Sequence, residues 1–283
     1  MISNCLITNP IIVREVIKYY QKTKLEDRWD RFIKVSEKPQ RQYRVKLREV
    51  FADQLDDILG NLKRKSVKAD GSIGYVDEQN LVDWNQYRIV YNEFGQLTLP
   101  GIMSAWAELE LEALEVGIAF DVLNPNVMQA VTNRSNLFSD SVINETRRLL
   151  HTVINDSMSA GDGIPQLTKK IQLLYENMSK YRATRIARTE AIWALNEGAL
   201  QGYTQSGVVE YKSWWSARDE RRCIFCASMH GKQIPVGVNF FNQGQSLTIP
   251  KPIKASLVQT MTFNYEDVRH PPLHPFVVAP FYQ

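Results

Sequence analysis

At residues 207–216 the chain has the sequence GVVEYKSWWS, and its character changes at this point. β-Branched and aromatic residues dominate the stretch, which predicts a strand, and Gly207 is placed to end the helix expected before it. Apolar residues recur at helical spacing on the N-terminal side, whereas turns and prolines are frequent on the C-terminal side. The sequence therefore predicts an α+β fold, with a mainly helical N-terminal body and a small β-rich, turn-rich C-terminal module.

Three regions are expected along the 283 residues. Residues 1–70 form a charged helical N-terminal region, residues 71–206 a helical body, and residues 207–283 a β-rich module that contains Cys and His. The first boundary depends on the sequence ADGSIG at residues 69–74, whose composition is typical of a break between elements.

Apolar periodicity predicts helices at residues 11–20, 42–62, 127–160, 166–177 and 180–205. Residues 76–123 are also expected to be helical, except for a loop at residues 92–101 that contains Gly95, Pro100 and Gly101. The sequence Asn124-Pro125-Asn126 is expected to end that helix. Short extended segments are expected at residues 232–236 and 245–249.

Composition excludes several classes of protein. Fourteen Gly and twelve Pro are too few for a collagen-like chain, and three Cys are too few for a disulfide-rich secreted scaffold. The apolar runs are far shorter than the roughly 20 residues that span a bilayer. No charged segment followed by an apolar one opens the chain, so no secretory signal is expected. We expect a soluble protein of a reducing compartment with no membrane partner.

Charge is distributed unevenly along the chain. Residues 1–70 carry a net charge of +6, residues 71–179 carry −8 and residues 180–283 carry +5. Two basic ends around an acidic middle suit contact with a polyanion such as DNA. The alternative is that these charges lie on solvated helix faces of mixed sign.

Cys223 and Cys226 form a CxxC pair, and three of the four histidines follow it: His230, His270 and His274. A CxxC turn can present two thiolates to one cation, and imidazoles from a distant segment can complete a tetrahedral site. Zinc suits mixed sulfur and nitrogen ligands, and its binding would stabilise a module with few periodic apolar residues. The predicted ligands of this structural zinc are Cys223, Cys226, His274 and His270, with His230 as the alternative fourth ligand.

Other interpretations of these residues remain open. The two cysteines could be a thioredoxin-like redox pair, which requires a βαβ context with the first cysteine at the start of a helix. The histidines could be surface residues. The chain contains no GxSxG, Walker A, GxGxxG or HExxH motif, so a structural metal is favoured over a catalytic one and no enzyme activity is expected.

Residues 182–190 have the sequence RATRIARTE. In a helix, Arg185 and Thr189 share a face, and so do Ile186 and Glu190. Arg188 and Glu190 are only two residues apart, so they are not expected to pair within the helix and are candidates to reach the β-rich module. The alternative is a charged helix that faces solvent.

Taken together, these segments resemble the phage head morphogenesis family, the Mu F-like minor head proteins. The resemblance covers roughly residues 125–280 and rests on the order of its motifs. The matching residues are Arg182-Ala183, Ile186-Ala187-Arg188-Thr189-Glu190, Asn196, Tyr203, Gly207, Lys212, Trp214-Trp215, Asp219, Arg221, Cys223, Cys226, Met229-His230-Gly231-Lys232 and Pro271-Pro272-Leu273-His274-Pro275. The family usually has a cysteine after the closing His-Pro, whereas here Phe276 follows Pro275.

The resemblance implies a structural role in procapsid and head assembly at the portal vertex, with packaged-DNA handling or ejection as a further role. It implies the portal protein, the major capsid or scaffolding protein and double-stranded DNA as candidate partners. The implied location is the virion, in the head interior or at the portal vertex, and the host cytoplasm during assembly. One alternative is a zinc-stabilised DNA-binding protein outside any virion. The other is a toxin or effector, because similar modules occur fused to toxin domains. Gln283 follows the module closely, so no room for such a domain is expected downstream.

Overall fold

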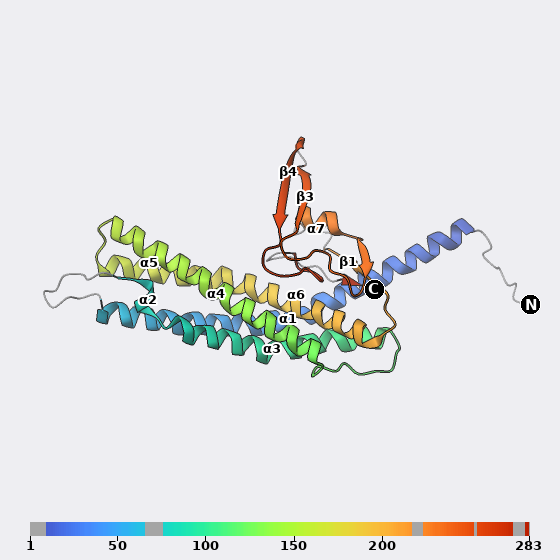
Figure 1. Ribbon diagram of the computed structural model, residues 1–283, viewed down its shortest axis with the longest axis horizontal. Coiled ribbons are helices and arrows are strands. Elements are labelled where there is room, and N and C mark those ends of the chain that lie inside the picture. Colours follow the sequence, from blue (N-terminus) through green and yellow to red (C-terminus); the bar gives the residue numbers. More distant parts are fainter. Residues whose placement is uncertain (1–9, 66–75, 217–222, 252–253, 274–280, 283) are drawn as a thin grey trace, which may run out of the picture.

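The computed structural model describes residues 10–65, 76–216, 223–251, 254–273 and 281–282. Long helices form an elongated bundle, and a smaller module with β-strands lies against one side of it (Figure 1). The helices are α1 (Pro10–Lys65), α2 (Glu78–Leu81), α3 (Trp84–Ala113), α4 (Pro125–Ser159), α5 (Ile164–Asn177) and α6 (Ala183–Ser206), with the π-helical turn η1 (Met178–Arg182) before α6. The α+β prediction is confirmed.

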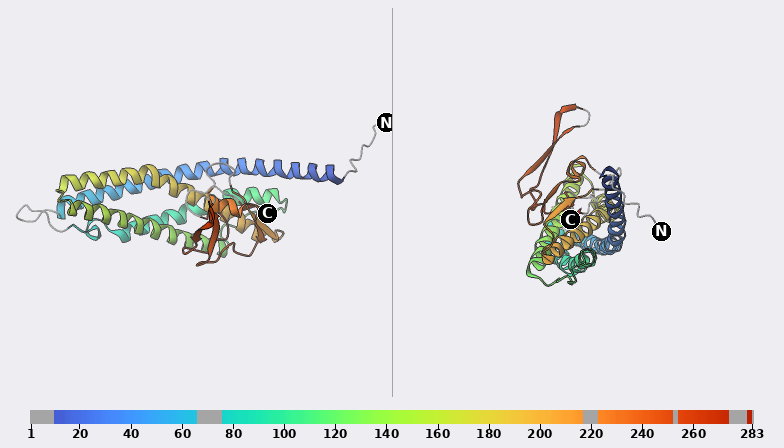
Figure 2. Two further views of the ribbon diagram at one scale, coloured as in Figure 1. Left: turned by 90° about the horizontal axis from the view of Figure 1, so that it is seen from above. Right: turned by 90° about the vertical axis from the view of Figure 1, so that its right-hand side faces the viewer.

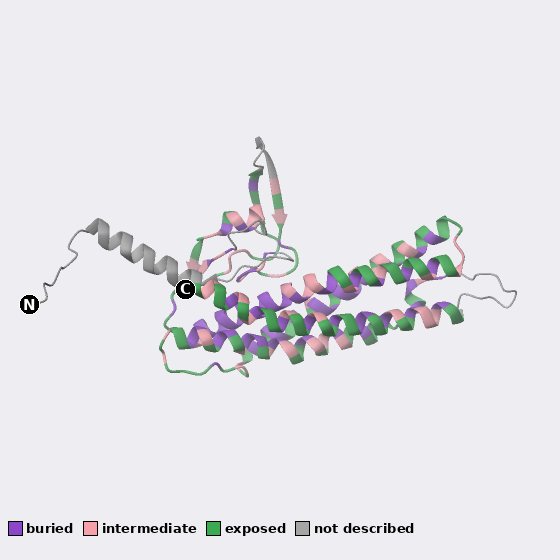
Figure 3. Cartoon of the chain, turned by 180° about the vertical axis from the view of Figure 1, so that it is seen from behind, coloured by how far each residue is buried: buried purple, intermediate pink, exposed green. Residues whose placement is uncertain are grey.

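Helix α6 lies at the centre of the bundle. Almost every residue from Thr189 to Tyr203 is buried, and the helix packs against α1 and α3. Buried faces point inward between the helices and exposed faces point outward (Figure 3). Gly198 allows α6 to approach α3 closely, because a Cβ at this position would lie 2.2 Å from the carbonyl oxygen of Met103. Gly207 ends α6 with a φ of +67°, as its position in the sequence predicted.

Helix α1 is one continuous element, where separate helices were expected at residues 11–20 and 42–62. Pro39 lies inside it. Buried Phe32, Tyr43 and Leu47 carry the apolar face of α1 across this proline and into the core of the bundle. The predicted boundary at residues 69–74 lies outside the described residues.

The predicted loop at residues 92–101 is wrong, because α3 runs through it with Pro100 inside the helix. A proline removes one backbone hydrogen bond and favours a break. Here buried Tyr91, Leu99 and Met103 form one apolar face that packs on neighbouring helices, and Gly95 lies tightly against Ser135 of α4. The packing of this face outweighs the local cost of the proline.

The predicted role of Asn124-Pro125-Asn126 is also wrong. Helix α3 ends at Ala113, and Asn124 is the N-cap of the next helix, α4. Its side chain accepts a hydrogen bond from the backbone N–H of Asn126 at 3.0 Å. Pro125 occupies the first helical position, where its missing N–H costs nothing.

Replacing Asn124 with alanine is expected to lower the free energy of unfolding by about 1 kcal/mol, because the first turn of α4 loses its capping acceptor. Urea denaturation followed by circular dichroism measures this change. Asn126→Ala is the matched control, because only the backbone of Asn126 takes part in the cap. Equal stability of the two variants would contradict the assignment of the cap.

The C-terminal module contains β1 (Tyr211–Trp214), α7 (Ile224–Met229), β2 (Gln233–Pro235), β3 (Ser246–Lys251), β4 (Lys254–Thr262) and β5 (Phe281–Tyr282). Strands β2, β1 and β5 form an antiparallel sheet in that order, and β3 and β4 form a hairpin that points away from the bundle (Figures 1 and 2). The module has its own apolar cluster: Trp214, Cys226, Met229, Phe263, Val268 and Leu273. Among the helices that the structure describes, none is both long enough and apolar enough to cross a bilayer.

Candidate functional site

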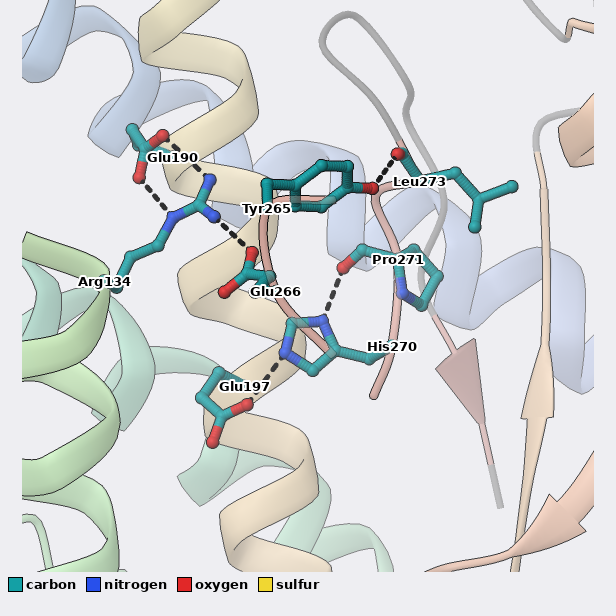
Figure 4. A network of polar contacts seen from close by, with 8 residues as sticks. All are labelled: Arg134, Glu190, Glu197, Tyr265, Glu266, His270, Pro271 and Leu273. Carbon is teal, nitrogen blue, oxygen red and sulfur yellow. Dashed lines mark hydrogen bonds and ion pairs between the residues drawn. The ribbon is translucent and has the colours of Figure 1, made fainter. Parts of the chain in front are cut away.

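The C-terminal module meets the bundle along α4 and α6, at a contact that we call the seam. The seam consists of Arg134 from α4, Glu190, Trp193 and Glu197 from α6, and residues 265–273 from the module (Figure 4). Glu190 and Glu197 are seven residues apart, close to two helical turns, so both face the module. Each of these buried carboxylates has its own cationic partner.

Arg134 joins the two parts of the molecule. Its guanidinium donates two hydrogen bonds to the carboxylate of Glu190, at 2.8 and 2.9 Å, and one to Glu266 of the module at 2.6 Å. Burial by itself lowers the pKa of Arg134, but attraction to Glu190 and Glu266 outweighs it and raises this pKa above its ordinary value. The indole of Trp193 lies 5.0 Å from the guanidinium carbon. Arg134 is therefore held as a permanent cation between α6 and the module.

Glu197 forms the second connection. It accepts a hydrogen bond from Nε2 of His270 at 2.8 Å and forms an ion pair with Arg269 at 3.2 Å, and both partners belong to the module. The side chain of Gln201 on α6 donates to the same carboxylate at 2.7 Å. Burial alone raises the pKa of Glu197, but the hydrogen bond from His270 and the charge of Arg269 lower it below its ordinary value. Glu197 thus stays ionised inside the protein.

The backbone of the module completes the seam. Nδ1 of His270 lies 2.5 Å from the carbonyl oxygen of Pro271, which also accepts from the side-chain amide of Asn196 on α6 at 3.2 Å. The hydroxyl of Tyr265 donates to the carbonyl oxygen of Leu273. These contacts fix residues 265–273 against α6. We call the contacts of Arg134 with Glu190 and Glu266, and of Glu197 with Arg269 and His270, the latch, because together they hold the module on the bundle.

Three of the predicted metal ligands, Cys223, Cys226 and His230, lie in or directly beside α7. Cys223 is the N-cap of α7, where its sulfur accepts from the backbone N–H of Cys226 at 3.3 Å, and Cys226 is buried in the apolar cluster of the module. His230 ends α7, and its Nδ1 lies 3.2 Å from the backbone nitrogen of Ser216. His270 belongs to the seam, and His274 lies outside the described residues.

Within the described residues, no three Cys, His, Asp or Glu side chains are close enough together to hold a metal ion. The metal site therefore stays a prediction. The redox interpretation requires a βαβ unit, and only part of that context is present. Cys223 does open a helix, but β1 and β2 on either side of α7 pair antiparallel, whereas a βαβ unit requires parallel strands.

A known family matches the part of the chain that contains Glu190, Glu197, Cys223 and Cys226. Residues 149–251 match the family model described as Phage Mu protein F like protein. The match confirms the resemblance found in the sequence over this part of the chain. No curated protein and no solved structure matches the chain.

The Mu F-like segment, residues 149–251, supplies only one side of the seam. It contains Glu190 and Glu197, whereas Arg134 and residues 265–273 lie outside it. Of the charged seam residues, Glu190 and His270 lie in motifs of the sequence, whereas no motif distinguishes Arg134, Glu197 or Glu266. One signal was present, because Arg134 follows Val127 and Val131 on the apolar stripe of α4, where a charge requires a buried partner.

Lys212 of β1 also lies in the Mu F-like segment, and it is 1% exposed. Its ammonium lies 5.7 Å from the centroid of the Phe240 ring. Burial, together with the nearby charge of Arg269, lowers the pKa of Lys212 from 10.5 to about 8, although Glu197 opposes this shift. Folding of the module therefore disfavours the charged form of Lys212.

The Lys212→Met variant is expected to be more stable than the wild type at pH 7 by about 2 kcal/mol, because it removes a partly desolvated cation. Between pH 8 and 10.5 the unfolded chain binds more protons at Lys212 than the folded chain, so this lysine makes the wild type more stable as the pH rises. The difference in free energy of unfolding between Lys212→Met and the wild type should therefore disappear between pH 8 and 10.5. Urea denaturation at a series of pH values measures it.

Lys232→Met is the matched control, because Lys232 is exposed. This variant should follow the wild type at every pH. Parallel curves for Lys212→Met and the wild type would contradict the proposed burial of a charged Lys212.

Proposed function

We propose that this chain is a minor head protein that acts in procapsid and head assembly at the portal vertex and catalyses no reaction. The observation that carries the proposal is the family match over residues 149–251. The proposed partners are the portal protein and the major capsid or scaffolding protein. The proposed location is the virion, in the head interior or at the portal vertex, and the host cytoplasm during assembly.

The fold supports a scaffolding role. A long bundle carries a smaller module on one side, and contacts of Arg134 with Glu266 and of Glu197 with His270 connect the two parts (Figures 1 and 4). Such a latch holds the module in one orientation, as a protein that bridges other subunits requires. The ordinary explanation for the latch residues is therefore mechanical and requires no turnover.

We also propose that the chain contacts packaged DNA. Arg31, Lys34, Lys38 and Arg41 are exposed and recur every three or four residues on α1, so they lie along one face of the helix. A row of cations on a helix suits the phosphate backbone and gives binding that weakens steeply with salt.

The main proposal is tested by mass spectrometry of purified phage particles that are produced from the genome encoding this chain. The chain should be present in the particles, should copurify with the portal protein, and its deletion should abolish infectious heads. Normal infectious particles without this chain would contradict the proposal. Salt-dependent DNA binding with no head partner would instead favour the zinc-stabilised DNA-binding alternative.

We propose in addition that the module holds one structural zinc through Cys223, Cys226 and His274. Cys226 and Leu273 pack in the same apolar cluster, and His274 follows Leu273 in the sequence. His270, whose ring nitrogens face protein oxygens, is the proposed fourth ligand, and His230, whose Nδ1 faces Ser216, is the alternative. Bound zinc would supply folding free energy to the module.

Elemental analysis of the purified chain tests the metal proposal. The wild type should contain about one equivalent of zinc, and Cys223→Ser should lose it because one thiolate ligand is gone. A Ser228→Ala variant in the same helix is the control and should keep its metal. Absence of zinc from the wild type, or full zinc content in Cys223→Ser, would remove the proposal.

A further inference from the structure

A cleft of about 450 Å³ lies between α4 and α6 on one side of the seam. Apolar and charged side chains line its walls in similar numbers, and the charged ones gather at two places along the cleft. The lining includes Leu137, Phe138, Val142, Ile186, Pro272 and Leu273 among the apolar residues. Clefts of this size and character commonly bind a ligand or a few side chains of a partner.

Two buried arginines line the cleft, and they differ in how they are neutralised. Arg134 is held by the carboxylates of Glu190 and Glu266. Arg182 is 8% exposed and donates to Thr146 Oγ1 at 2.8 Å and to the backbone carbonyl of Val142 at 3.1 Å. Among the described residues, no carboxylate forms an ion pair with Arg182.

The surroundings of Arg182 leave it a cation with unused donors. A guanidinium has five N–H donors, and both recorded acceptors of Arg182 are neutral oxygens. Burial lowers the pKa of Arg182, although Tyr91 and Glu145 oppose this shift. Glu145 of α4 lines the same cleft and attracts Arg182, but its carboxylate accepts two hydrogen bonds from Arg148, at 2.7 and 2.8 Å. Arg185 lines the same part of the cleft and adds a second positive charge.

We infer that this cleft binds a segment of a partner protein that inserts apolar side chains and places a carboxylate on Arg182. Charge complementarity decides the chemistry of the occupant, because a buried guanidinium gains most from a carboxylate that can accept two of its donors. The apolar walls supply burial for the flanking side chains. The C-terminal part of this chain does not fit this chemistry, because its sequence contains no Asp or Glu after Asp267.

The inference adds a contact surface to the proposed function but does not depend on it, since it holds whichever protein supplies the segment. Its test therefore uses the purified full chain and a library of random short peptides as the probe. Peptides are selected for binding to the wild type and counter-selected against Ser141→Trp. Ser141 is exposed and lines the cleft, so a tryptophan there fills the cleft from its open side without removing a core contact.

The selected peptides should carry Asp or Glu next to Leu, Ile or Phe. Their affinity, measured by fluorescence anisotropy, should fall at least about tenfold in Ser141→Trp and in Arg182→Gln, and should weaken with salt. Ser159→Trp is the matched control, because Ser159 is exposed at the end of α4 and does not line the cleft; this variant should bind like the wild type.

Three results would overturn the inference. The first is that no peptide is enriched over the Ser141→Trp counter-selection. The second is that the enriched peptides lack acidic residues or bind Ser141→Trp as well as the wild type. The third is that the wild type self-associates in sedimentation and Ser141→Trp makes it monomeric, because the occupant is then a second copy of this chain. None of these results bears on whether the chain is present in particles, so a failure here is distinct from a failure of the proposed function.

Discussion

The Arg134→Met variant is expected to lose about 3–5 kcal/mol of unfolding free energy. Methionine fills a similar volume, so the loss comes from charge and not from a cavity. Glu190 would remain buried between α4 and α6 without the guanidinium that donates two hydrogen bonds to it. Glu266 would lose its partner across the seam as well. Urea denaturation at neutral pH measures the stability of the variant.

The double variant Arg134→Met/Glu190→Leu separates the ion pair from the packing. It removes both buried charges, so it should recover most of the stability lost in Arg134→Met. Hydrogen exchange at residues 265–273 adds a local measurement, because these residues should exchange faster in the single variant as the module detaches. A single variant within about 1 kcal/mol of the wild type, or a double variant less stable than the single one, would contradict the role of the latch.

Gly198→Ala should be the second most damaging of the substitutions considered, with an expected loss of about 3 kcal/mol or more. Alanine is the better helix former by about 1 kcal/mol, so helix propensity alone predicts the opposite sign. The new methyl group would lie 2.2 Å from the carbonyl oxygen of Met103 and 2.8 Å from its Cα. These are backbone atoms of α3, so the two helices must move apart at the centre of the bundle.

Two other glycines serve as controls for this prediction. A Cβ at Gly202, one turn further along α6, would meet its neighbours at ordinary distances from 3.6 Å, and a Cβ at Gly101 on α3 would meet nothing within 4 Å. Gly202→Ala should be close to neutral, and Gly101→Ala should gain about 0.5–1 kcal/mol from helix propensity. Thermal denaturation of the three variants side by side gives the comparison, and an equal effect at all three positions would contradict the close approach of α6 and α3.

Local patterns in the sequence predicted most of the secondary structure. The helices expected at residues 127–160, 166–177 and 180–205 correspond to α4, α5 and η1 with α6, because each has an apolar stripe at helical spacing. Gly207 ends α6 and the β-branched stretch after it contains β1, as predicted. Trp214 is buried and Trp215 is half-buried, because adjacent side chains of an extended segment point to opposite faces.

Two predictions were wrong for different reasons: a distant contact outweighed a local preference at residues 92–101, whereas the local motif at residues 124–126 is compatible with either end of a helix. Gly95, Pro100 and Gly101 favour a loop by themselves, yet α3 stays helical because its buried face packs on neighbouring helices, with Gly95 against Ser135. Asn124 and Pro125 favour either end of a helix, and only the hydrogen bond to the N–H of Asn126 shows that they begin one. The apolar spacing of a segment contains no information about its contacts in the folded protein, so spacing alone does not predict these outcomes.

The chain's own residue pattern established the helical body, the β-rich module, the place where one gives way to the other and the likeness to Mu F-like proteins. These features depend on neighbours in sequence, since backbone preference and apolar spacing act over a few turns. The tertiary structure determined which charged side chains became partners. Arg134, Glu190 and Glu266 are separated by many residues, and so are Glu197 and His270. Their pairing exists because burial makes an isolated charge costly, so α6 and the module can close only where each buried carboxylate meets a cation.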